Sequence, residues 1–347
     1  MTIPQRSKSL DYLRVFASTW VLFYHLADPS QVQLLFNTAF TKYIFSNGWY
    51  GVEIFFLLSA FLIGSQLQYL NVSKFLKRRT TRLLPGLTIG LALSLLIAKV
   101  GGVPGHSQSF PRPIASYLAS VVLLYQHFDV KPASNTLWSL IIEVRYYALA
   151  SIYLVIRRIN PFRHRSILPL IAIYLVLMLV DQTFSNIRGL IHLDLSLDRA
   201  ANDNGFLPIF ILGTITGYYR LTFKTTWGLE LKLVTSLCWF LIFIYHDASN
   251  LLIGILSLSW ILLLRCNRTN LNSESGKFLR ALSDATFITY LIHLELGDLV
   301  LFKLKQFGLF QPYFSLLITI LVVVSTSIFI SYLFERPSRN KLQSLLK

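Results

Sequence analysis

Charged residues are scarce in this chain. They make up 14% of its 347 residues, whereas soluble proteins carry roughly 25%. Hydrophobic residues account for 54% of the sequence, and the mean hydropathy is +0.56. Too few polar side chains remain to cover a single apolar core, so the composition excludes an ordinary soluble protein and indicates an integral membrane protein.

Cysteine is almost absent, and no cleavable leader is recognisable. The two cysteines, Cys238 and Cys266, exclude a disulfide framework or a cysteine metal cluster, and their position in or beside apolar segments predicts a packing role. The first apolar run begins at Leu10, contains charged residues and lacks a small-residue cleavage site. We therefore expect it to be a retained helix.

Acidic residues are half as frequent as basic ones, with 16 Asp and Glu against 32 Lys and Arg. The resulting charge of +16 does not indicate nucleic-acid binding, because the basic residues cluster in short segments between apolar runs. That distribution is typical of the positive-inside rule, with attraction to anionic membrane lipids as a secondary effect.

The apolar runs predict an all-α membrane bundle. Each is about long enough to cross a hydrocarbon core of roughly 30 Å. A further apolar run, 114–127, is short and follows a proline-rich approach, so we expect a re-entrant or interfacial segment there. The ten predicted spanning helices are 10–28, 50–69, 83–100, 136–156, 166–183, 206–221, 229–246, 249–265, 284–302 and 313–334.

The Lys and Arg distribution predicts the orientation. If 114–127 does not cross, 22 basic residues lie on the cytoplasmic side and 8 on the outer side; if it crosses, the numbers are 12 and 18. The first arrangement obeys the positive-inside rule. We therefore predict a multi-pass protein of the cytoplasmic (inner) membrane, with both termini cytoplasmic and one membrane-embedded domain over 1–347.

Ionisable side chains inside the first predicted helix indicate a site. Arg14 and His25 are eleven residues apart, so they project from nearly the same helix face, about 16 Å apart along the axis. Asp11 lies one turn before Arg14 on that face. An Asp11–Arg14 ion pair with a packing role for His25 is one interpretation, and a functional site is the other.

Further polar residues favour the functional interpretation. Glu53 and Glu143 lie in the same outer part of the predicted bundle as His25, and His293 lies near mid-membrane. A histidine with a nearby carboxylate can deprotonate a hydroxyl group. A cytoplasmic basic loop suits an anionic ligand with several phosphates, although a topology signal or lipid contact also explains it; it contains Lys74, Lys77, Arg78, Arg79 and Arg82.

Six motifs in order resemble the acyltransferase 3 family of integral membrane O-acyltransferases. They extend over residues 10–337, and the chain is similar to the stand-alone type without a C-terminal esterase-like domain. The motifs are LDYLR at 10–14 with His25, GVEIFFLLSAF at 51–61, RRTTRLLP at 78–85, LWSLIIE at 137–143 with Tyr146 and Tyr147, LSDATF at 282–287 with YLIH at 290–293, and YLFERP at 332–337.

The resemblance implies transfer of an acyl group, most often acetyl, from acyl-CoA such as acetyl-CoA to a hydroxyl of a cell-surface glycan or lipid-linked saccharide, without a metal. It implies that His25 is the catalytic base or acyl acceptor and that Glu143 supports His25 or the acceptor hydroxyl. Arg14 would act in catalysis and donor contact. The CoA phosphates would be held by Arg78, Arg79 and Arg82, and substrate would be bound by Asp11, Glu53, Trp138, Ser139 and His293.

A transporter or flippase of lipid-linked sugars is the alternative. Buried charges would then line a substrate path. Such folds often contain internal repeats that are detectable as paired hydropathy patterns. The sequence has no such pairing, which favours the transferase.

Overall fold

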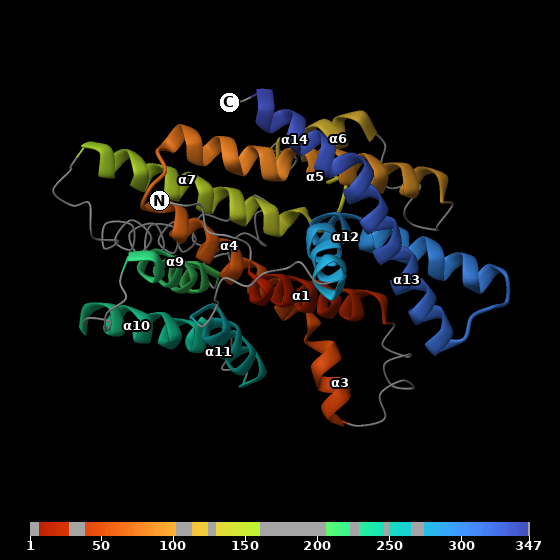
Figure 1. Cartoon of the computed structure of the whole chain (residues 1–347). Helices are drawn as coiled ribbons and strands as arrows, with labels where there is room; N and C mark the ends of the chain where they lie inside the picture. Colours follow the sequence, from red (N-terminus) through yellow and green to blue (C-terminus); the bar gives the residue numbers. More distant parts are fainter. Residues whose placement is uncertain are drawn as a thin grey trace, which may run out of the picture. The chain divides into compact units, whose positions relative to one another are not determined.

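The computed structural model describes most of the chain as helices, and the described residues contain no strand. It describes residues 7–27, 39–101, 113–123, 130–159, 206–222, 229–245, 250–264 and 274–345. The elements, shown in Figure 1, are α1 (Lys8–Leu26), α3 (Ala39–Ser46), η1 (Gly48–Tyr50), α4 (Gly51–Leu67), α5 (Val72–Val100), α6 (Pro113–Val121), α7 (Leu137–Ile159), α9 (Leu207–Thr222), α10 (Leu229–Tyr245), α11 (Asn250–Leu264), α12 (Glu274–Gln306), α13 (Pro312–Ile330), the π-helix η5 (Ser331–Glu335) and α14 (Arg336–Leu345).

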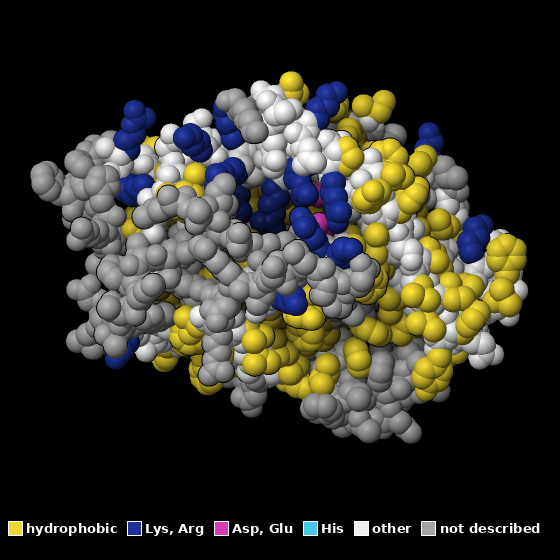
Figure 2. All heavy atoms as spheres, in the orientation of Figure 1, with side chains coloured by type: hydrophobic (Ala, Val, Ile, Leu, Met, Phe, Trp, Pro, Cys, Tyr) yellow, Lys and Arg dark blue, Asp and Glu magenta, His cyan; other side chains and the backbone are white. Residues whose placement is uncertain are grey.

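The helices agree with the predicted all-α membrane protein. Within the described ranges, 5 helical segments are long and apolar enough to cross a membrane. Hydrophobic side chains also cover broad areas of the face in Figure 2, as expected for a lipid-facing surface. A described helix overlaps each predicted span except 166–183, which lies outside the described residues. The predicted number of ten remains a prediction.

The short apolar run 114–127 is helical only in its first part. Helix α6 has 9 residues, a length of about 14 Å, which is less than half of a hydrocarbon core. It ends in a turn where Leu123 has a φ of 57°. Residues 124–129 lie outside the described part of the chain.

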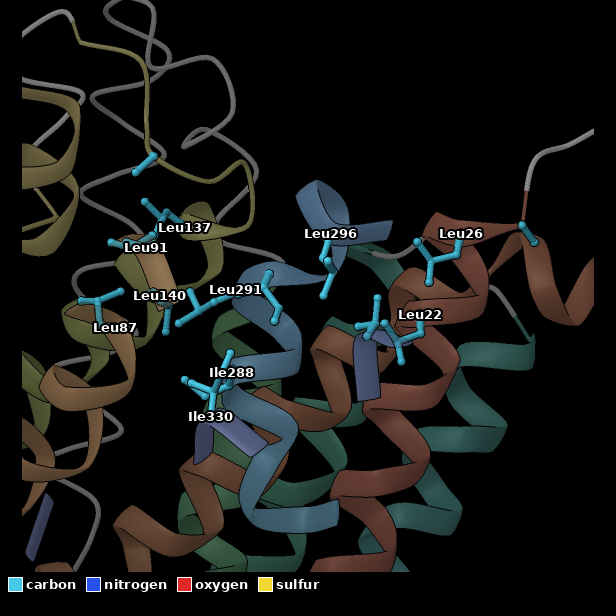
Figure 3. Close-up of a cluster of buried hydrophobic side chains, with 14 of the residues drawn as sticks. Leu22, Leu26, Leu87, Leu91, Leu137, Leu140, Ile288, Leu291, Leu296 and Ile330 are labelled. Atoms are coloured by element: carbon cyan, nitrogen blue, oxygen red, sulfur yellow. The ribbon is translucent and has the colours of Figure 1, made fainter. Parts of the chain in front are cut away.

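The chain divides into two compact units. The first contains Met1–Val52, Lys77–Ile141 and Asn267–Lys347, and the second contains Glu53–Leu76 and Ile142–Cys266. In the first unit α12 packs against both α1 and α13. Figure 3 shows its apolar core, to which α1 contributes Leu22 and Leu26, and α12 contributes Ile288, Leu291 and Leu296.

The second unit is built around a close approach of α4 and α9. A Cβ atom on Gly64 would meet the backbone of Thr214, and one on Gly213 or Gly217 would meet the backbone of α4 at Leu57 or Phe61. Small residues at such contacts let helix backbones approach closely, as is usual in membrane bundles. Helix α9 also contacts α10 and α11.

Candidate active site

One end of α1, which the charge distribution predicts to be cytoplasmic, contains a buried carboxylate with hydrogen-bonding partners. Asp11 is 0% exposed, and its Oδ1 accepts a hydrogen bond of 2.6 Å from the Ser283 hydroxyl of α12. The same oxygen lies 3.5 Å from the Arg14 guanidinium, whose side chain is 18% exposed. The ion pair considered from the sequence is therefore present, and it orients Arg14 while a ligand could still reach it.

The other end of α1 carries an imidazole in a different situation. His25 is exposed, and its ring centroid lies 5.1 Å from that of His293 on α12 and 4.8 Å from that of Tyr24. An exposed ring is not enclosed as a packing histidine would be, which favours the functional interpretation, and the catalytic role of His25 stays a prediction. The structure brings together two histidines that the sequence argument had placed separately.

These two contacts between α1 and α12 occur in the same order along the two helices. Asp11 meets Ser283 near the start of each helix, and His25 meets His293 further on. The helices therefore run in the same direction, which the predicted topology also requires of its first and ninth spans. The predicted parallel direction of these two helices was the one feature of the sequence consistent with a contact between His25 and His293. Direction alone cannot show that two helices are neighbours.

Hydrogen bonds and apolar contacts fix the position of His293. It is 1% exposed, and its Nδ1 lies 2.8 Å from the carbonyl oxygen of Tyr290. The Tyr290 hydroxyl lies 2.7 Å from the hydroxyl of Ser139 and donates to the carbonyl oxygen of Thr136 at 3.1 Å. Sequence reasoning named His293 and Ser139 as site residues, but it gave Tyr290 only as part of a motif and did not name Thr136; these two residues connect them.

Trp138 and Ser139 occupy the first turn of α7. Ser139 is buried and takes part in the Tyr290 network, whereas Trp138 is half-buried beside it. The predicted substrate-binding role of both stays a prediction, and Ser139 acts at least as an anchor for α12.

Glu53 and Glu143 belong to the second unit. Glu53, on α4, is 0% exposed. Glu143 is half-buried, and its Oε1 accepts hydrogen bonds from the Ser59 hydroxyl and, at 2.5 Å, from the Tyr147 hydroxyl. Two donors on one oxygen fix the orientation of the carboxylate. The support of His25 by Glu143 stays a prediction.

The basic segment 74–82 is helical and is not the expected loop. Helix α5 starts at Val72 and continues through this segment and past Pro85. Because the segment is helical, its basic side chains point in different directions: Arg78 is exposed and Arg82 half-buried, whereas Arg79 is only 3% exposed. Among these three, Arg78 and Arg82 are the ones that a solvated phosphate can reach.

Metal chemistry has no candidate ligand set in the part of the chain that the structure covers. No group of three or more His, Cys, Asp or Glu side chains there is arranged to hold an ion. Cys238 is a buried free cysteine, whereas Cys266 lies outside the described residues. The chemistry available near α1 is that of two imidazoles, a guanidinium, the Asp11 carboxylate and several hydroxyl groups.

Comparison with known proteins gives the family. The family model for an acyltransferase domain matches residues 7–336. O-acetyltransferase OatA of Staphylococcus aureus (strain NCTC 8325 / PS 47) is 26% identical over 258 residues, which cover 68% of this chain and 38% of that relative. Nodulation protein 10 of Rhizobium leguminosarum bv. viciae is 28% identical over 160 residues, which cover 40% of this chain and 42% of that relative.

The alignments therefore span less than half the length of each of these relatives. No solved structure matches the chain significantly. The family match extends from the residue before α1 to the first residue of α14, and it includes Arg14, His25 and His293. The chain belongs to the acyltransferase 3 family of membrane acyltransferases.

Proposed function

We propose that the protein transfers an acyl group, most often acetyl, from acyl-CoA to a hydroxyl of a cell-surface glycan or lipid-linked saccharide. Membership of the family supports acyl transfer, and a relative named as an O-acetyltransferase supports acetyl transfer to oxygen. The six sequence motifs support CoA as the carrier and a sugar as the acceptor.

The observation that carries the proposal is the position of His25. It is an exposed imidazole at one end of α1, beside a second imidazole, on the same helix as a partly exposed Arg14. The two residues are separated by about 16 Å along the helix axis. This separation suits an extended donor that is anionic at one end and reactive at the other.

In the proposed reaction His25 acts as a general base. An imidazole nitrogen of His25 takes the proton of the acceptor hydroxyl as its oxygen attacks the thioester carbonyl carbon. The new carbon–oxygen bond forms, the carbon–sulfur bond breaks, and the thiolate of CoA takes the proton from the imidazolium. The proton and both electron pairs are then accounted for, and no metal is needed in this scheme.

The donor is proposed to enter from the cytoplasmic side. Arg78 and Arg82, on the first turns of α5, would bind its phosphates, and Arg14 would contact the arm or orient the reacting groups. Figure 2 shows Lys and Arg side chains gathered around acidic ones on the face in view. The exposed Arg78 and the half-buried Arg82 give α5 a basic surface. Arg79, which is buried, would support this surface from within.

The test is transfer by the full chain reconstituted in liposomes. We expect label from acetyl-CoA to appear on a glycan or lipid-linked acceptor, with equal release of free CoA. His25→Gln should lower the rate by about 10²- to 10⁴-fold, since the general base is lost. The matched control is Tyr24→Phe, which changes the neighbouring exposed side chain and should keep the rate.

Two results would overturn the proposal. One is the absence of CoA release and acceptor labelling with every acceptor tried, which would favour the transporter alternative. The other is a full rate in His25→Gln, which would remove His25 from the chemistry.

A further inference from the structure

The protonation pattern of the His293 ring can be deduced from its surroundings. Its Nδ1 lies 2.8 Å from the carbonyl oxygen of Tyr290. A carbonyl oxygen can only accept a hydrogen bond, so Nδ1 must carry the proton. In a neutral imidazole the other nitrogen, Nε2, then bears a lone pair and is an acceptor.

This acceptor is buried and lacks a donor within the described part of the chain. Leaving a buried acceptor without a donor costs free energy, and an apolar ring of the same shape would avoid the cost. The hydroxyl of Tyr290, whose ring also contacts His293, already interacts with Ser139 and Thr136. The hydrogen bond from Nδ1 gives His293 a structural role, but that role leaves the buried Nε2 acceptor unexplained.

The ring next to His293 on α1 can supply the missing donor. The centroids of the His25 and His293 rings are 5.1 Å apart, and their planes are inclined by 53°. His25 is exposed, and the χ2 torsion of a histidine has a broad, shallow minimum. Rotation of the His25 ring can therefore turn one of its N–H groups toward His293 without disturbing the core.

We propose that His293 is a positioning residue for His25. Its Nε2 accepts a hydrogen bond from one ring N–H of His25, which leaves the other nitrogen of His25 as the base that faces the acceptor hydroxyl. The inference rests on the proposed function, in which His25 is that base. His293 only accepts the hydrogen bond throughout, and the hydroxyl proton passes to His25 and then to the CoA sulfur.

The fold holds His293 firmly enough for this role. Its neighbours on α12, Leu291 and Ile292, are each 0% exposed within the apolar core. Tyr290 joins α12 to the start of α7 through Ser139. The fixed ring is thus on α12, and the ring that can adjust is on α1. A base oriented by a second fixed group is a recurring arrangement in acyl transfer.

Two substitutions at His293 test the inference in the reconstituted full chain. His293→Phe keeps the ring shape and removes the acceptor, and we expect kcat to fall about a hundredfold with an unchanged KM for acetyl-CoA. His293→Gln retains a side-chain carbonyl that can accept from His25, and it should recover a substantial part of kcat. The melting temperature of His293→Phe should change little, because the substitution removes the unsatisfied Nε2 acceptor together with one hydrogen bond to the Tyr290 carbonyl oxygen.

The outcomes separate this inference from the proposed function. If the wild type transfers acetyl and His25→Gln does not, but His293→Phe is fully active, the inference alone fails. Equal loss of kcat in the Phe and Gln variants with a lower melting temperature also overturns it, because the role would then be structural. If the wild type itself transfers nothing, the proposed function fails first.

Discussion

The two ends of helix α1 meet the same neighbour, α12, in opposite ways. At one end Asp11 is fully buried, and its carboxylate is bonded by Ser283 and paired with Arg14. At the other end His25 is exposed, and the buried ring beside it, His293, has an acceptor atom for which the described residues provide no donor.

The difference indicates that one end of α1 stabilises the packing of the helix, whereas the other end is available for chemistry. A buried charge is tolerated only when it is paired and hydrogen-bonded, so Asp11 stabilises one arrangement of α1 on α12 and sets the direction of Arg14. A group that takes a proton from substrate must be reachable and must have a vacant lone pair. We therefore expect substitutions at the Asp11 end to act mainly on stability and those at the His25 end mainly on rate.

The largest effect on stability is expected from Asp11→Ala. It removes a buried carboxylate that pairs with the partly buried Arg14 guanidinium and accepts a hydrogen bond from Ser283, which should cost about 3 to 5 kcal/mol in the free energy of unfolding. Unfolding of the purified protein in detergent measures it.

Ser283→Ala is the graded control for that experiment. It removes one hydrogen bond to the Asp11 carboxylate and keeps the ion pair, so the loss should be about 1.5 to 3 kcal/mol. Normal stability of Asp11→Ala together with a lost rate would break the comparison, because both ends of α1 would then act in the chemistry.

The same contrast can be tested on helix α5, with an intermediate effect. Arg78 is exposed and Arg79 is buried. Arg78→Ala should raise the KM for acetyl-CoA about tenfold, since a charge-assisted hydrogen bond to phosphate contributes about 1.5 kcal/mol or more, and it should leave stability unchanged.

Arg79→Met is the matched variant on the neighbouring position. It should lower the melting temperature more than Arg78→Ala does, with a smaller change in KM for acetyl-CoA in the fraction that remains folded. The opposite pattern would show that the buried arginine, and not the exposed one, contacts the donor.

The smallest effect is expected from Tyr290→Phe. This change keeps the carbonyl oxygen that holds His293 and removes only the hydroxyl that joins Ser139 and Thr136. Stability should fall by about 1 kcal/mol, and kcat should fall by less than about tenfold. A loss of kcat as large as that of His293→Phe would instead assign a direct role to the Tyr290 hydroxyl.

Much of the local structure could be predicted from the chain. Apolar runs of the right length predicted the helices, because backbone polar groups in a membrane must be satisfied within the segment. Helical spacing predicted that Asp11, Arg14 and His25 share a face, and the ion pair of the first two is present. By contrast, the basic segment 74–82 was expected to be a loop, because its charged residues interrupt the apolar pattern. The structure instead has a helix that begins at Val72.

The sequence by itself determined the class of the protein, the helical faces and the family. Composition, helical periodicity and motif order can all be read along the chain without knowledge of tertiary contacts. Only the tertiary structure decided which faces meet. That His25 meets His293, that Ser283 bonds Asp11, and that Tyr290 links α12 to α7 depend on contacts across up to 272 positions of sequence. Helical periodicity says nothing about such distant pairs, since packing of whole helices selects them.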